Sequence, residues 1–201
     1  LSAVISVLLA TGIIRTSFDT SLEALLSEND PYLDELILMD EAFPSSLEVR
    51  FAFVTDESDT VFNSELLAAI DDLKDSYSAI PFADRLTTIL DYVSPETQSR
   101  LFIKALRSYT EEELAEVADA ALADRLLTAN LLSDDAALTF AIITTNSADI
   151  SADDRLDIAT AALVLRDEIR SRHPDVQILA NSEVMLEQSS QQAMVDDLTN
   201  L

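Results

Sequence analysis

The sequence lacks most of the residues on which common catalytic and cofactor sites depend. Its 201 residues include no cysteine and one histidine, which excludes disulfides, thiolate zinc sites, cysteine nucleophiles and metal sites with several histidines. The one glycine is Gly12, whereas phosphate-binding loops, dinucleotide fingerprints and the G-x-S-x-G nucleophile elbow all need several. We therefore expect a protein that is not an enzyme and that holds no cofactor or metal.

Basic side chains are also scarce. The chain has 12 lysines and arginines against 38 aspartates and glutamates, a formal net charge of −26. Phosphate binding needs a basic surface, so nucleic acid is excluded as a partner. Because 48% of the residues are hydrophobic, the chain can still bury a core, and its length allows one large domain or two small ones.

The first 14 residues, LSAVISVLLATGII, carry no charge. A helix needs about 20 apolar residues to cross a bilayer, so this segment alone is too short. It is interpreted either as the end of a transmembrane helix that begins outside this sequence or as a buried helix or strand of the core. No other stretch approaches transmembrane length.

Apolar periodicity and capping residues predict an alternating order of elements. Alternating or β-branched apolar residues predict strands at residues 47–54, 86–93, 137–145 and 176–180. Helices are predicted at about 31–43, between Asp59 and Pro81, at 96–108, at 111–127, from Ser151 to His173 and at 182–201. Residues 110–113 and 151–154 are predicted capping boxes. In the helix after Ser151 the predicted apolar stripe is Ile158, Ala162, Leu165 and Ile169. Residues 128–135 are predicted to form a connector that ends in a turn at residues 133–135.

This order predicts an α+β fold. Two strand–helix–strand units, residues 47–93 and 136–180, are separated by a helical insert at 94–130 and followed by a C-terminal helix at 182–201. Such units indicate a split βαβ, ferredoxin-like sheet with its helices on one face.

Adjacent acids are the commonest candidates for chemistry. They occur at Asp71-Asp72, Glu111-Glu112-Glu113, Asp134-Asp135, Asp153-Asp154 and Asp196-Asp197. Neighbouring residues on a helix point apart, and helix N-termini favour negative charge. We therefore expect solvated or capping roles, and catalytic residues are predicted to be none.

Two further sites have a functional and a structural interpretation. Residues 56–59, Asp-Glu-Ser-Asp, could supply oxygens to Ca²⁺ but lack the glycine and distal glutamate of an EF-hand loop; a polar loop is the favoured interpretation. His173, close to Arg170 and Arg172, is interpreted as a charge at a helix C-terminus rather than as part of a catalytic triad.

Three segments carry a resemblance to a known family. Residues 13–36 contain Phe18, Asp19, Ser21, Leu22 and Glu23, followed by Asp30-Pro31. Residues 130–135 precede an apolar strand, with Asp135 where the family commonly has glycine. Residues 178–201 resemble a final strand and helix, with Asn181 at a usual glycine position, and asparagine tolerates positive φ best among the other residues. Together these segments resemble the first extracytoplasmic loop of transporters of the resistance-nodulation-division superfamily, MmpL-like or predicted exporter branch.

The resemblance implies a function that the residues alone do not. It implies a porter-type domain at residues 15–201 of a proton-driven exporter of hydrophobic or lipid-like molecules, in the cytoplasmic membrane and facing the periplasm or cell exterior. Its partners would be the substrate, the second extracytoplasmic loop and the membrane helices, and an isolated loop could self-associate. Met185 and Met194 would pack in the core or line a substrate path. The alternative is an acidic α+β binding or scaffold domain, free-standing or tethered by one helix.

Overall fold

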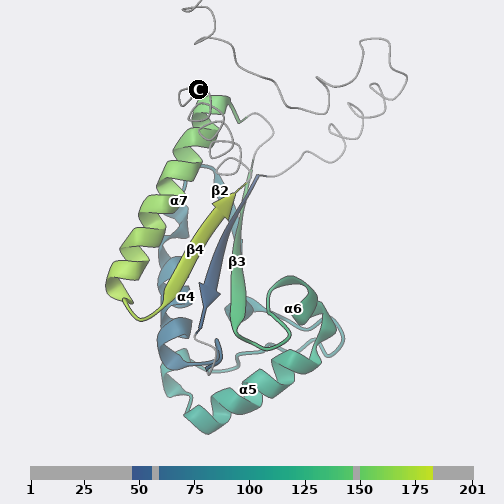
Figure 1. Cartoon of the computed structure of the whole chain (residues 1–201). Helices are drawn as coiled ribbons and strands as arrows, with labels where there is room; N and C mark the ends of the chain where they lie inside the picture. Colours follow the sequence, from purple (N-terminus) through teal and green to yellow (C-terminus); the bar gives the residue numbers. More distant parts are fainter. Residues whose placement is uncertain (1–46, 56–58, 147–149, 183–201) are drawn as a thin grey trace, which may run out of the picture. The chain divides into compact units, whose positions relative to one another are not determined.

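The computed structural model describes residues 47–55, 59–146 and 150–182, all of which fall within one compact unit, Ser45–Leu201. The fold is α+β, as the sequence predicts, with a four-stranded antiparallel sheet and several helices (Figure 1). The apolar segment 1–14, the helix predicted at 31–43 and the helix predicted at 182–201 lie outside the described residues.

The sheet is built from β1 (Glu48–Val54), β2 (Ala83–Thr87), β3 (Leu138–Thr145) and β4 (Gln177–Ser182). Its strand order is β2-β3-β1-β4, and every neighbouring pair is antiparallel. It follows that β1 and β2 are parallel with β3 between them, and that β3 and β4 are parallel with β1 between them. This arrangement is compatible with a ferredoxin-like fold.

Two helices cover one face of this sheet, α4 (Ser64–Ser76) and α7 (Ala152–Arg172). The short helix η1 (Tyr77–Ala79) connects α4 to β2, and α7 leads into β4. Only one side of β1 is fully buried, and its residues share a core with both helices (Figure 1). Each helix contributes one apolar stripe to that core. The stripe predicted for α7 is confirmed, since Ile158, Ala162, Leu165 and Ile169 are all buried.

The insert between β2 and β3 forms η2 (Ile89–Asp91), η3 (Leu106–Ser108), α5 (Glu111–Ala123) and α6 (Arg125–Asn130). Val54 pairs with Leu138 at one end of the sheet, whereas Val49 pairs with Ser182 near the other. The chain therefore enters β1 and leaves β4 at one end, and the insert lies at the opposite end (Figure 1).

The helix predicted at 96–108 is wrong. Residues 95–97 form a turn, Val93 forms an isolated bridge with Arg100, and the only helix in that range is the three-residue η3. The ring of Phe102 stacks on Phe62 at 6.4 Å and meets Tyr109 edge-on at 5.7 Å. These tertiary aromatic contacts override the local signal of a serine followed by proline.

Three other boundaries differ from the prediction. The second strand is β2 at Ala83–Thr87, because residues 89–91 turn into η2 instead of continuing to residue 93. The helix predicted at 111–127 ends at Ala123, since Asp124 begins a separate helix there. That helix, α6, takes up residues 128–130 of the predicted connector.

The left-handed residues also differ from the prediction. Ala136 has φ 55°, whereas the Asp135 carboxylate accepts hydrogen bonds from the Ser133 hydroxyl and the Ala137 N–H and so closes the turn. Asn181, predicted to follow the last strand, lies inside β4 and pairs with Arg50. Extended backbone in a ladder has negative φ, so glycine-like freedom is not needed at that position.

Candidate functional site

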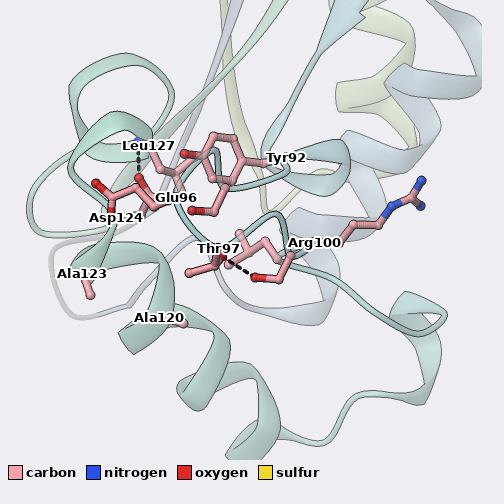
Figure 2. A pocket seen from close by; sticks show the side chains of 11 residues that line it. Tyr92, Glu96, Thr97, Arg100, Ala120, Ala123, Asp124 and Leu127 are labelled. Atoms are coloured by element: carbon pink, nitrogen blue, oxygen red, sulfur yellow. Dashed lines mark hydrogen bonds between the residues drawn. The ribbon is translucent and has the colours of Figure 1, made fainter.

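A pocket lies in the insert, between the loop of residues 92–101, the end of α5 and the start of α6 (Figure 2). Its volume is about 280 Å³. Hydroxyl and carboxylate groups alternate with small apolar side chains on its wall, which consists of Tyr92, Ser94, Glu96, Thr97, Ser99, Arg100, Leu101, Ala120, Ala123, Asp124 and Leu127.

The loop at one side of this pocket is held by its own backbone. Ser94 N–H donates to the Ser99 carbonyl at 2.9 Å, and Gln98 N–H donates to the Ser94 carbonyl at 2.8 Å. Gln98 has φ 54°, the left-handed conformation that closes this tight loop. The guanidinium of Arg100 extends away from the pocket (Figure 2), so the wall is acidic rather than mixed in charge.

Asp124 holds the three sides of the pocket together. Its Oδ1 accepts the backbone N–H groups of Leu126 at 3.0 Å and Leu127 at 3.2 Å, which caps α6. Burial alone would raise the pKa of this carboxyl, but the neighbouring hydroxyls of Ser94 and Tyr92 and the hydrogen bonds from the two backbone N–H groups lower it below its ordinary value. The carboxylate therefore stays ionised at neutral pH.

Tyr92 brings a buried hydroxyl to the same place. Burial first, then the neighbouring Asp124 carboxylate and the charge of Glu96, raise the pKa of Tyr92 to about 12. The hydroxyl oxygen faces Asp124 but has no partner with full hydrogen-bond geometry among the described residues. It is a polar atom that a ligand or water in the pocket could satisfy.

The arrangement favours binding over proton transfer. Asp124 is engaged by donors from its own chain, and the raised pKa keeps the Tyr92 phenol protonated. A general acid–base pair needs groups with pKa values near the working pH. The pocket supplies instead an ionised carboxylate, hydroxyls and a small apolar floor.

The paired acids that the structure describes are mostly exposed, and Glu113 and Asp154 have the capping role that was the other predicted possibility. Thr110 with Glu113 and Ser151 with Asp154 form the two predicted capping boxes. Hydrogen bonds lower the pKa of three of these carboxyls: from Lys104 and Thr110 to Glu113, from Ser133 and Ala137 to Asp135, and from Ser151 to Asp154. Asp196-Asp197 lie outside the described residues.

Asp72 departs from that pattern because it joins the two helices of the sheet. Its Oδ2 accepts from Arg172 Nη1 at 2.7 Å and lies 3.1 Å from His173 Nε2. His173 ends α7, as predicted, and its N–H donates to the Ile169 carbonyl. The lone histidine thus has a structural partner, and no acid–hydroxyl pair of a triad surrounds it among the described contacts.

The candidate calcium loop is described only at Asp59, since residues 56–58 lie outside the described residues. The Asp59 carboxylate accepts from Thr60 N–H at 2.8 Å and from Asn63 Nδ2 at 3.4 Å. Both contacts are internal to the loop. Within the described ranges no group of three or more acidic or histidine side chains is arranged to hold a metal ion.

A second candidate surface is the side of the sheet opposite α4 and α7. No helix of the described residues lies over it (Figure 1). Cross-strand pairing places Ala52 between Phe140 and Leu179, and the exposed fraction of Leu179 is 51%. The apolar residues of this surface, which we call the open sheet face, are Ala52, Val54, Leu138, Phe140, Ile142 and Leu179.

Tyr92 and Asp124 were not among the residues that sequence reasoning selected. Asp124 interrupts the apolar run of residues 114–127, and an aspartate followed by a new apolar pattern is an N-cap signal that could have located the break. The pairing of Tyr92 with Asp124 spans 32 positions and has no local signal. Met185 and Met194 lie outside the described residues.

A scan against models of protein families finds no match to the chain, and a search of curated proteins finds none either. Among the described residues, no helix combines the length and the apolar character that crossing a membrane requires.

Proposed function

We propose that this chain forms an extracytoplasmic, porter-like domain of a proton-driven membrane exporter and takes part in binding and passing on hydrophobic or lipid-like molecules. The observation that carries the proposal is the open sheet face. The resemblance of residues 13–36, 130–135 and 178–201 to the resistance-nodulation-division superfamily supports it, as does a sheet compatible with the ferredoxin-like fold.

The open sheet face has the chemistry that such a molecule needs. Phe140, Ala52 and Leu179 form one apolar row across three strands, and Leu138 and Val54 form the next. Beyond the row, Arg50 pairs with Glu48 at 2.8 Å on the same face. An apolar body can displace water along the rows, while a polar group can contact the ion pair.

Under this proposal the chain acts as one part of a larger transporter. The second extracytoplasmic loop and the membrane helices are its partners, and the residues that couple transport to protons lie in those helices. The membrane part then lies beyond the end of the sheet at which β1 begins and β4 ends, and the insert points away from the membrane.

The binding step is tested by substituting one exposed leucine of the open sheet face. We expect Leu179→Gln to weaken binding of a hydrophobic dye, N-phenyl-1-naphthylamine, by several-fold, measured by fluorescence titration of the full chain. Leu126→Gln, on α6, is the matched control because its exposed fraction is 48% against 51%. Equal binding by both variants and the unmodified chain would show that the open sheet face is not the site.

The exporter context is tested separately by reading the coding sequence beyond residue 201. We expect a hydrophobic run of about 20 residues, followed by several more. A stop codon or a soluble domain there would contradict the exporter. It would leave the alternative, an acidic α+β binding or scaffold domain, which the polar pocket around Asp124 favours.

A further inference from the structure

Helix α7 carries apolar residues on the side that faces the sheet and also, among polar ones, on the side that faces away from it. Ile158, Leu165 and Ile169 face the sheet and are at most 2% exposed. Each residue turns an α-helix by about 100°, which places Leu156, Leu163 and Val164 on the side that points away from the sheet. Their exposed fractions are 46%, 36% and 61%.

We call these three side chains the outer spot of α7. Leu156 lies seven and eight positions, about two helical turns, from Leu163 and Val164, and exposed Thr160 lies between them, three or four positions from each. Single exposed apolar residues need no explanation, but three on one side of a helix are a candidate interaction site.

Acidic residues flank the outer spot at both ends. Asp153 is exposed about one turn before Leu156 and Asp157 directly after it, and neither has an ion pair among the described residues. Asp167 and Glu168 are exposed on the C-terminal side of the outer spot, where Arg166 and Arg172 contact them at 2.8 and 3.3 Å.

This flanking charge argues against a second copy of the chain as the occupant. An antiparallel pair of α7 helices crossing at Thr160 would match Leu156 with Val164 of the other copy. The same register would place Asp153 of each copy opposite Asp167 of the other, which gives two such pairs. Like charges in contact oppose association. Each copy also carries a formal net charge of −26.

We propose that the outer spot of α7 binds an amphipathic helix of another protein, whose apolar stripe is flanked by lysine or arginine. Apolar residues four and seven positions apart on that helix would meet Leu156, Leu163 and Val164, as in helix-in-groove recognition. Its basic residues would meet Asp153 and Asp157, which adds attraction at the rim and excludes acidic partners. This inference does not rest on the exporter proposal.

The test uses the full chain and three synthetic helical peptides of about 18 residues. One has a leucine stripe with flanking lysines, one has the same stripe with flanking glutamates, and one has the lysines without the stripe. Isothermal titration should detect binding of the first peptide alone, and the affinity should fall as salt is raised. Equal binding of the lysine peptide without the stripe would overturn the proposal, because the overall negative charge would explain it.

Matched variants locate the binding. The double substitution Leu163→Gln with Val164→Gln should weaken binding roughly tenfold or more, whereas Ile103→Gln, which removes an 83% exposed side chain from the insert, should leave it unchanged. Asp153→Asn with Asp157→Asn should weaken it less and reduce its dependence on salt, with Asp71→Asn and Asp75→Asn on α4 as controls.

Two outcomes name a different occupant and would equally overturn the proposal. A dimer in sedimentation that the Leu163 and Val164 substitutions dissociate would identify a second copy. A large loss of stability in the same double variant, without any peptide, would show that another part of this chain covers the spot.

Discussion

Helices α4 and α7 lie on the same side of the sheet and present opposite kinds of outer surface. On α4 the outward positions include Glu65, Asp71 and Asp75, all exposed acids. On α7 the corresponding side carries the apolar outer spot. Covering the sheet needs only one apolar stripe from each helix. Packing against the sheet therefore explains the apolar residues of that stripe in α4 and α7, but it does not explain the outer spot of α7.

The largest expected effect on the free energy of unfolding comes from the buried apolar stripe that each helix turns toward the sheet. Ile169→Ala in α7 and Leu73→Ala in α4 each remove a side chain that is 0% exposed, and each should lower the free energy of unfolding by about 2–5 kcal/mol. Urea denaturation measures both. Leu163→Ala, on the outer spot, should change it by less than about 0.5 kcal/mol; a loss as large as that of Ile169→Ala would erase the difference between the two sides of α7.

The N-caps give the next largest effect. Asn63 Oδ1 accepts from Leu66 N–H at 2.8 Å in α4, and the Ser151 hydroxyl accepts from Asp154 N–H at 3.2 Å in α7. Asn63→Ala and Ser151→Ala should each lower the free energy of unfolding by about 1 kcal/mol. Thermal denaturation compares them with Ser64→Ala in the first turn of α4, whose cap hydrogen bond comes from Asn63 and not from Ser64. This variant should stay near the unmodified chain.

The contact between the two helices gives a smaller effect. Asp72 of α4 meets Arg172 of α7 at 2.7 Å and His173 at 3.1 Å, and its side chain is 36% exposed. Asp72→Asn should therefore lower the free energy of unfolding by roughly 0.5 kcal/mol. Asp71→Asn removes the same charge from a position without an ion pair among the described residues, so an equal loss there would assign the effect to net charge alone.

The smallest effect distinguishes the two caps by their response to acid. The Ser151 hydroxyl and then its N–H lower the pKa of Asp154 in the folded chain. This contribution to stability is fully present above the unfolded aspartate pKa, about 3.9, and is lost as the pH falls through the lower folded value. The cap of α4 is an asparagine and does not titrate.

A carboxyl-carbon NMR titration of Asp154 measures this directly. We expect a midpoint below that of an unperturbed aspartate. In Ser151→Ala it should move part of the way back, because the variant loses the hydroxyl and keeps the backbone N–H. A midpoint that Ser151→Ala does not move would mean that the Ser151 hydroxyl is not a cause of the lowered pKa.

Sequence reasoning succeeded where local signals and burial agree. The capping boxes at Thr110 and Ser151, and the β-branched strand at 137–145, combine a local signal with an apolar pattern of the right period. The α+β class follows from the order of these elements.

It failed where distant contacts decide the local conformation. The turn at residues 95–97 depends on loop hydrogen bonds, and the position of Phe102 depends on Phe62 and Tyr109. The pocket needs Tyr92 beside Asp124, a contact across 32 positions that no short-range pattern encodes. The outer spot of α7 was missed because only the buried stripe of that helix was sought.

The separation of the insert from the chain ends makes the sheet a rigid spacer. The seven residues of β1 set this spacing at about 24 Å. The segment between Thr87 and Leu138 supplies buried residues to the core, but it lies at the end of the sheet opposite to the one where the chain enters β1 and leaves β4. A displacement of the sheet end where the chain enters β1 and leaves β4 would therefore tilt the sheet and move the pocket with it.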